Sequence, residues 1–256
     1  MKHIKKKYYF EESVPPVQEG REFLSAHRNN SKELKKIKKD NIPFLFTTEK
    51  TYIMSMFYNY NGVETVIPIP DLTLVYYNNA YISNKQRKEM EKKLFAKLRD
   101  TEGDVSESVT EELYHYIGMA TSTIIQMFTS IESFINHLIP DDKTYIKVRK
   151  ERTEYFNKEQ IQIHIRFWDK INEVLPYFCN LNFFKTPTPT NMHIRKLKEL
   201  RDSIVHTKSN SLFMEQSKLI ESLLKFKYDE TLLSIRKFMN FYKDQYIIDC
   251  NCNSDY

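Results

Sequence analysis

Glycine and proline are scarce in this chain, with 4 glycines and 9 prolines among 256 residues. All-β sandwiches and barrels join many short strands through turns that are rich in these two residues. Their scarcity therefore argues against an all-β fold and favours long helices. Hydrophobic residues make up 41% of the chain, which suffices for the core of one or two globular domains.

Cysteine is also rare, and long apolar runs are missing. Cys179 stands alone, and Cys250 and Cys252 form a single C-x-C pair, whereas a disulfide framework or a four-ligand zinc site needs more partners. No apolar run approaches the roughly 18 residues of a membrane span, and no apolar segment of a signal peptide follows the basic start. We therefore expect a cytoplasmic protein without a membrane segment, a metal or a cofactor.

The charge balance is moderately basic. A formal net charge of +5 permits an anionic partner such as a nucleic acid without requiring one. Five lysines fall within the eight residues Lys32–Lys39, which we predict to be a short helix. Such a run forms either a solvated face or a surface that contacts phosphates.

The strand signals lie in the first hundred residues. Thr51–Tyr58 and Val63–Pro68 are rich in β-favouring residues, and Asn61-Gly62 lies between them. This pair is the strongest short hairpin signal because both turn residues must accept positive φ. Leu72–Tyr77 is predicted as a third strand, and the tyrosines of this region suit either burial or stacking on bases.

A charged helix is predicted to follow, from Ser83 or Asn84 to about Leu98. The segment Thr101–Asp104 is the predicted boundary between a small α+β region, residues 1–100, and a helical domain, residues 101–256.

Helical periodicity dominates the second part. An apolar stripe with steps of four and three, stopped by Pro140, predicts one long helix. Further helices are predicted over Glu159–Leu175, from Met192 to about Thr207 with a cap at Thr190 or Asn191, and over Glu215–Tyr246 with a break near Lys227–Asp229. Together these helices predict a mainly α, antiparallel bundle. The stripe consists of Leu113, Ile117, Ala120, Ile124, Met127, Ile131, Phe134 and Leu138.

The most concentrated chemistry lies at residues 201–206, at the end of the third of these helices. Arg201 falls in an apolar stripe with Ile194, Leu197, Ile204 and Val205, where a guanidinium needs a partner. His206 is about 140° further around an ideal helix, so the two side chains do not meet on one straight helix. Asp202 lies four residues before His206 and is placed to accept its ring N–H.

An imidazole and a guanidinium together suit the cleavage of RNA. The imidazole can take a proton from a ribose 2′-OH or give one to the leaving oxygen, and the guanidinium can bind the phosphate. The alternative is an Asp–His pair and a buried arginine salt bridge without catalysis. The pattern is common, because Arg21 and His27 match it as well, but without a long apolar helix before them.

Basic residues surround this motif. Residues 191–208 contain five Arg or Lys and two Asp or Glu, a net charge of +3. This local field suits an RNA backbone, and a solvated basic face is the alternative. The predicted RNA-binding residues are His193, Arg195, Lys196, Lys198 and Lys208.

The second part of the chain, about residues 105–246, resembles the HEPN family of helical bundles found in prokaryotic toxins, abortive-infection proteins and CRISPR-associated effectors. Leu197–His206 matches the family's Arg-x4-6-His motif, although the family commonly has Asn where Asp202 stands. Thr129–Asn136 is similar to the Ser/aromatic-x-Glu-x-Phe segment that ends the long first helix in many members.

The resemblance implies a homodimer with the two motifs facing each other, and metal-independent RNA cleavage that leaves a 2′,3′-cyclic phosphate. Arg201 and His206 would be catalytic, Asp202 would orient them, and Glu132 would be a buried partner of Arg201. Phage defence or a toxin–antitoxin system, with an antitoxin or other protein partner, would be the setting. The alternative is a non-catalytic HEPN-like module that binds protein or RNA.

Overall fold

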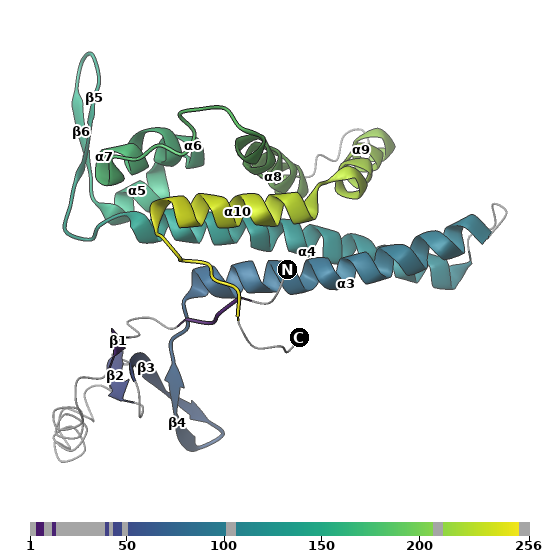
Figure 1. Ribbon diagram of the computed structural model, residues 1–256, viewed down its shortest axis with the longest axis horizontal. Coiled ribbons are helices and arrows are strands. Elements are labelled where there is room, and N and C mark those ends of the chain that lie inside the picture. The colour runs from purple at the N-terminus through teal and green to yellow at the C-terminus, as the bar shows by residue number, and fades with distance from the viewer. Residues whose placement is uncertain are drawn as a thin grey trace. The chain divides into compact units, whose positions relative to one another are not determined.

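The chain forms two compact units in the computed structural model (Figure 1). One unit is Lys5–Leu74, and the other, a helical unit, consists of Met1–Ile4 with Val75–Tyr256. This division lies earlier than the boundary predicted at Thr101–Asp104, because nearly all of helix α3 (Leu72–Asp100) groups with the helical unit. The structure describes residues 4–7, 12–13, 39–40, 43–47, 51–100, 106–206 and 212–250.

The smaller unit contains the predicted hairpin. Strand β3 (Thr51–Tyr60) pairs antiparallel with β4 (Val63–Pro68), and Asn61 and Gly62 have φ angles of 51° and 85°. Both turn residues therefore have the positive φ that a tight hairpin turn demands, which confirms the prediction. Strand β3 also pairs with β2 (Phe44–Thr47) and β1 (Glu12–Ser13). Most of the predicted lysine-rich helix, residues 32–38, and the Arg21–His27 match lie outside the described residues.

The predicted third strand at Leu72–Tyr77 is wrong, because helix α3 begins there. Asp71 Oδ1 accepts hydrogen bonds from the backbone N–H groups of Thr73 at 3.0 Å and Leu74 at 3.4 Å. An acidic residue before the first turn satisfies N–H groups that a helix leaves without partners. Aromatic and β-branched residues favour strands only weakly, and this cap with a helical burial pattern overrides that preference.

Helix α4 (Glu107–Leu138) is central to the helical unit, which confirms the predicted long helix. It packs against α8 (Pro189–Val205), α9 (Leu212–Lys225) and α10 (Tyr228–Tyr242), and through Val109 and Tyr116 against Leu94 of α3; Figure 1 shows α10 lying along it. Five members of the predicted stripe, from Ala120 to Phe134, are buried, and Leu113, Ile117 and Leu138 are partly buried. The break predicted near Lys227 is also confirmed, because it separates α9 from α10.

The region predicted as one helix over Glu159–Leu175 is divided into several short elements. They are α5 (Lys158–His164), α6 (Phe167–Asp169), the π-helix η1 (Lys170–Val174) and α7 (Leu175–Cys179). Ile165 has extended backbone angles, φ −89° and ψ 128°, which end α5. Apolar spacing alone does not reveal such a break, because the apolar residues on both sides are packed into the core.

A second hairpin was not predicted. Strands β5 (Tyr145–Val148) and β6 (Thr153–Phe156) pair antiparallel, and Figure 1 shows them projecting from the helices of their unit. Tyr145 is buried, but Val148 and Tyr155 are largely exposed. Strands of four residues with little burial carry too weak an alternation to be recognised from the sequence.

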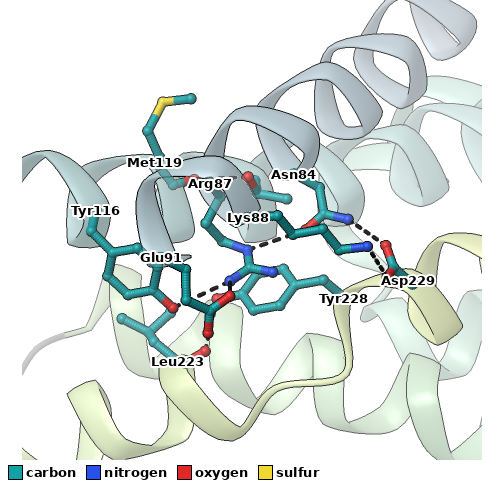
Figure 2. Close-up of polar contacts among 10 residues, drawn as sticks. Asn84, Arg87, Lys88, Glu91, Tyr116, Met119, Leu223, Tyr228 and Asp229 are labelled. Carbon is teal, nitrogen blue, oxygen red and sulfur yellow. Dashed lines mark hydrogen bonds and ion pairs between the residues drawn. The ribbon is translucent and has the colours of Figure 1, made fainter. Parts of the chain in front are cut away.

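A buried arginine links α3 to other helices of its unit (Figure 2). Arg87 Nε donates to Asn84 Oδ1 at 3.1 Å, and Arg87 Nη1 donates to Glu91 Oε2 at 2.8 Å and to the Tyr116 hydroxyl at 3.2 Å. Its guanidinium carbon lies 3.9 Å from the centre of the Tyr228 ring. These contacts join α3 to α4 and α10, and they compensate for the burial of a charge.

Across the ranges that the structure describes, no helix combines the length and the apolarity that crossing a membrane requires.

Candidate functional site

Helix α8 carries the candidate motif, and its start is fixed by a side-chain cap. Thr188 Oγ1 accepts a hydrogen bond from the Asn191 N–H at 3.2 Å, and Pro189 occupies the first turn. The cap therefore lies at Thr188 and not at the predicted Thr190 or Asn191, because proline suits the first helical position, where no N–H donor is needed. The helix ends at Val205, and His206 follows it with φ −111° and ψ 47°.

Arg201 lies at the edge of the buried face of α8. The fully buried face consists of Asn191, Ile194, Leu197 and Leu200, and the Arg201 side chain is 30% exposed. Its guanidinium carbon stands 4.8 Å from the centre of the Phe128 ring on α4. The predicted need for a partner is thus met by an aromatic face and by the Asp202 carboxylate, which lies 3.2 Å from Arg201 Nη1.

Val205 was predicted to belong to the same apolar stripe, but half of its surface is exposed. Helix α8 ends at this residue, and a side chain in the last turn loses the neighbours that cover the earlier turns.

Phe128 is the first ring of an aromatic row. Its ring centre lies 4.8 Å from that of Phe167, Phe167 lies 5.0 Å from Trp168, and Trp168 lies 5.5 Å from Phe184. Arg195 covers the far end of the row, 4.9 Å from the Trp168 ring centre and 5.5 Å from that of Phe184. Arg195 and Arg201 therefore each stack on an aromatic ring, which orders their side chains while leaving N–H groups for an anion.

Asp202 is paired with cations and not with His206. Its carboxylate accepts from Lys198 Nζ at 2.5 Å and from Arg201 Nη1 at 3.2 Å. Burial raises the pKa of Asp202, but the hydrogen bonds and charges of Lys198 and Arg201 outweigh it, so the pKa lies below its ordinary value. Within the described ranges, no hydrogen bond joins Asp202 to the His206 ring. The predicted tautomer-fixing contact is therefore wrong, because two nearby ammonium and guanidinium groups compete better for the carboxylate.

His206 lines a cleft between α8 and α9. The cleft has a volume of about 390 Å³, and Asp202 lies in its wall, whereas Arg201 does not. The imidazole is exposed. His206 thus lines this cleft and Arg201 does not, in keeping with their separation around the helix. The lining residues are Leu200, Asp202, Ser203, His206, Glu215, Lys218, Leu219 and Ser222.

A second, larger cleft continues along the same two helices. Its volume is about 660 Å³, and it shares Leu200, Ser203 and Ser222 with the first. His193 and Lys196, two of the predicted RNA-binding residues, line it, together with Lys227 from the α9–α10 connection. The two clefts therefore form one groove, which we call the α8–α9 groove.

The hydrogen bonds of His193 fix its tautomer. The Ser234 hydroxyl donates to the Glu230 carbonyl at 2.7 Å, so its oxygen can only accept from His193 Nδ1, which lies 2.9 Å away. The neutral ring then carries its proton on Nδ1, and Nε2 is an acceptor. Desolvation lowers the pKa of His193; the charge of Glu230 opposes this, and the charges of Lys227 and Lys196 add to it.

This lowered pKa predicts a loss of stability in acid. The unfolded chain binds the proton first, so the contribution of His193 is complete above about pH 6.5 and is lost as the pH falls below that value toward the folded-state pKa. The wild type should therefore lose more free energy of unfolding than His193→Gln between about pH 7.5 and about pH 5. Urea denaturation at the two pH values measures this difference, with His115→Gln, on the exposed side of α4, as control. An equal loss in wild type and His193→Gln contradicts it.

Glu132 does not pair with Arg201 in the part of the chain that the structure describes. Its charge acts instead on Lys170, whose Nζ donates to Asn136 Oδ1 at 3.1 Å and to the Gln162 carbonyl at 3.0 Å. Burial lowers the pKa of Lys170, and the charge of Glu132 opposes this. The predicted role of Glu132 as partner of Arg201 is therefore wrong, because the π-helix η1 places a lysine beside it.

The remaining predicted residues separate into three groups. Lys196 is exposed in the groove, Lys198 is bound to Asp202, and Lys208 lies outside the described residues. Over the ranges described, no three His, Cys, Asp or Glu side chains gather in a way that could hold a metal ion. Lys218 and Lys227, which line the groove from α9 and its connection, were not predicted, because they lie on a segment that shares no sequence motif with α8.

Comparison of the chain with protein-family models, with curated proteins and with solved structures found no match.

Proposed function

We propose that the helical unit is a metal-independent endoribonuclease of the HEPN type, acting in phage defence or in a toxin–antitoxin system. The observation that carries the proposal is the placement of the Arg201-x4-His206 motif. His206 stands at the end of α8 in an open cleft, and Arg201 extends from the same helix end with part of its side chain in solvent. Both groups are accessible to a polynucleotide.

The chemistry follows from these two groups. The neutral His206 imidazole accepts the proton of a ribose 2′-OH, the 2′-oxygen attacks the adjacent phosphorus, and the bond from phosphorus to the 5′-oxygen breaks. A protonated imidazole supplies the proton to that leaving oxygen. The products are a 2′,3′-cyclic phosphate and a 5′-hydroxyl, and Arg201 offsets the charge that develops on the phosphate oxygens.

A second copy of the chain would complete this site. Arg201 contacts Phe128, whereas His206 lines the cleft and Arg201 does not, so among the described residues neither cleft of the α8–α9 groove is lined by both side chains. Apolar side chains are exposed at the end of α8 and on α9, where Val205 is 50%, Met214 65% and Phe213 85% exposed. A homodimer that covers them would bury apolar surface and set two motifs facing each other.

One observation favours a second candidate, a non-catalytic module that binds RNA or a protein partner such as an antitoxin. Asp202 already engages the Arg201 guanidinium and carries a negative charge at the place where a phosphate would bind. Catalysis requires the phosphate to displace this carboxylate, whereas a binding role does not.

Incubation of the pure protein with labelled single-stranded RNA tests the proposal. We expect cleavage that persists in excess EDTA and leaves 2′,3′-cyclic phosphate ends, identified by their conversion with acid to 2′- and 3′-phosphates. Size-exclusion chromatography with light scattering should show a dimer. Stable binding of intact RNA without cleavage between about pH 5 and about pH 8, where histidine titrates, would instead establish the binding module.

A further inference from the structure

The larger cleft of the α8–α9 groove contains two cations that form no ion pair with any residue in the described ranges. Lys196 on α8 and Lys227 before α10 both line it, and neither has an acidic partner among the residues that the structure describes. Their neighbours differ, because Lys225 is paired with Glu221 and Lys198 with Asp202. The positive charges of Lys196 and Lys227 act on the same part of the cleft, because each of them lowers the pKa of His193. Two unpaired ammonium groups that converge on one cleft suit an anion such as phosphate.

The rest of the wall offers apolar surface and hydrogen-bond acceptors. Met192 and Phe226 contribute apolar surface, and Glu199 contributes a carboxylate. The Ser222 hydroxyl donates to the Lys218 carbonyl at 2.7 Å and the Thr231 hydroxyl to the Lys227 carbonyl at 2.6 Å, so both hydroxyl oxygens can act only as acceptors for a further group. His193 Nε2 is also an acceptor, because the neutral ring carries its proton on Nδ1. A nucleobase has apolar faces and N–H groups at its edge, which such a wall complements.

The His193 end of the cleft lies along α8 at a distance from His206. His206 lies 13 positions after His193, which corresponds to about 20 Å along a helix axis. At about 3.4 Å per stacked nucleotide, this length equals roughly six nucleotides of one strand. The shared residues Leu200, Ser203 and Ser222 make the path between the two ends continuous.

We propose that the cleft lined by His193, Lys196 and Lys227 is a phosphate-binding subsite for single-stranded RNA, which holds a nucleotide several positions away from the bond at His206. The two lysines bind the backbone phosphate, and the apolar wall receives the base. This subsite rests on the proposed function for the identity of the strand. The subsite extends that function because Arg201 and Lys198 at the cleavage site are already paired with Asp202, and a substrate then needs further phosphate contacts to stay bound.

Binding of a fluorescent ten-nucleotide RNA to the His206→Ala protein tests the subsite, because that background removes the proposed cleavage while His206 itself is exposed. Lys196→Ala/Lys227→Ala should weaken binding at least tenfold at low salt. Two lost phosphate contacts should also reduce the slope of log K against log salt by about 1.4. The matched control is Lys92→Ala/Lys93→Ala, which removes the same charge from exposed positions on α3 outside the groove.

The outcomes separate the subsite from the proposed function. Equal affinity and equal salt slope in the groove variant and in the control overturn the subsite, even where wild-type protein cleaves RNA. A tenfold loss with the reduced slope supports the subsite, even where no cleavage is found and the proposed function fails. AMP and UMP form the second arm. The contrary result is a mononucleotide that binds as tightly as the ten-nucleotide RNA and loses that binding in the groove variant. That result would assign the cleft to a free nucleotide and overturn the proposal that it binds an RNA strand.

Discussion

Replacement of His206 by alanine is expected to lower the rate of RNA cleavage at least a hundredfold, because a positioned general acid or base contributes roughly 10²- to 10⁴-fold. His206 is exposed at the end of α8, so the change removes the imidazole without opening a cavity. Arg201→Ala should cause a loss of similar size through the phosphate charge, together with the loss of its contact to Phe128. Initial rates on a labelled RNA under single-turnover conditions measure both effects.

Mixing the two inactive variants distinguishes a site shared between copies from a site within one chain. In a shared site, a dimer of one Arg201→Ala chain and one His206→Ala chain keeps one complete pair. Random reassociation makes half of the dimers mixed, so about a quarter of wild-type activity should return, by subunit counting alone. Activity that stays absent after subunit exchange is confirmed would place the pair within one chain, and full cleavage by either single variant would refute the assigned catalytic roles.

Replacement of Arg87 by alanine is expected to lower the free energy of unfolding of the helical unit by about 3 kcal/mol. The guanidinium is buried, and its loss leaves Asn84 Oδ1 and the Tyr116 hydroxyl without their donor while removing the stack on Tyr228 (Figure 2). Groups that stay buried without partners cost more than the contact itself contributed. Urea denaturation followed by circular dichroism at the helical wavelengths measures the change.

Two further variants make that test specific. Arg99→Ala removes the same residue type from an exposed position of α3, and it should change the free energy by no more than about 0.5 kcal/mol. Arg87→Lys keeps the charge but lacks the planar guanidinium with its several N–H donors. Its free energy of unfolding should therefore lie between those of the wild type and Arg87→Ala. An Arg87→Ala protein as stable as Arg99→Ala would contradict the structural role of this network.

Features of the fold that have a local cause could be predicted from the sequence. The turn at Asn61 and Gly62 follows from the backbone angles that two residues must adopt, and the long helix α4 follows from an apolar period within one segment. The separation of Arg201 from His206 on α8 follows from helix geometry in the same way.

Other features depended on which elements pack together. Asp202 had three potential partners within four positions on either side, and its carboxylate pairs with Lys198 and Arg201 and not with His206 in the folded helix. Glu132 was assigned to Arg201, but the π-helix η1 brings Lys170 to it from 38 positions away. Likewise Leu72–Tyr77 became helical through the cap at Asp71, against its local preference.

The sequence by itself therefore determined a mainly helical chain with a small hairpin region, and it singled out residues 201–206 as the candidate motif. Periodicity and turn angles suffice for this because they act between neighbours in the chain. Only the tertiary structure decided that α8 and α9 enclose a groove, that Lys227 joins Lys196 and His193 in it, and that Arg201 stacks on Phe128 outside it. These placements depend on packing between segments distant in sequence, and no local pattern encodes which faces meet.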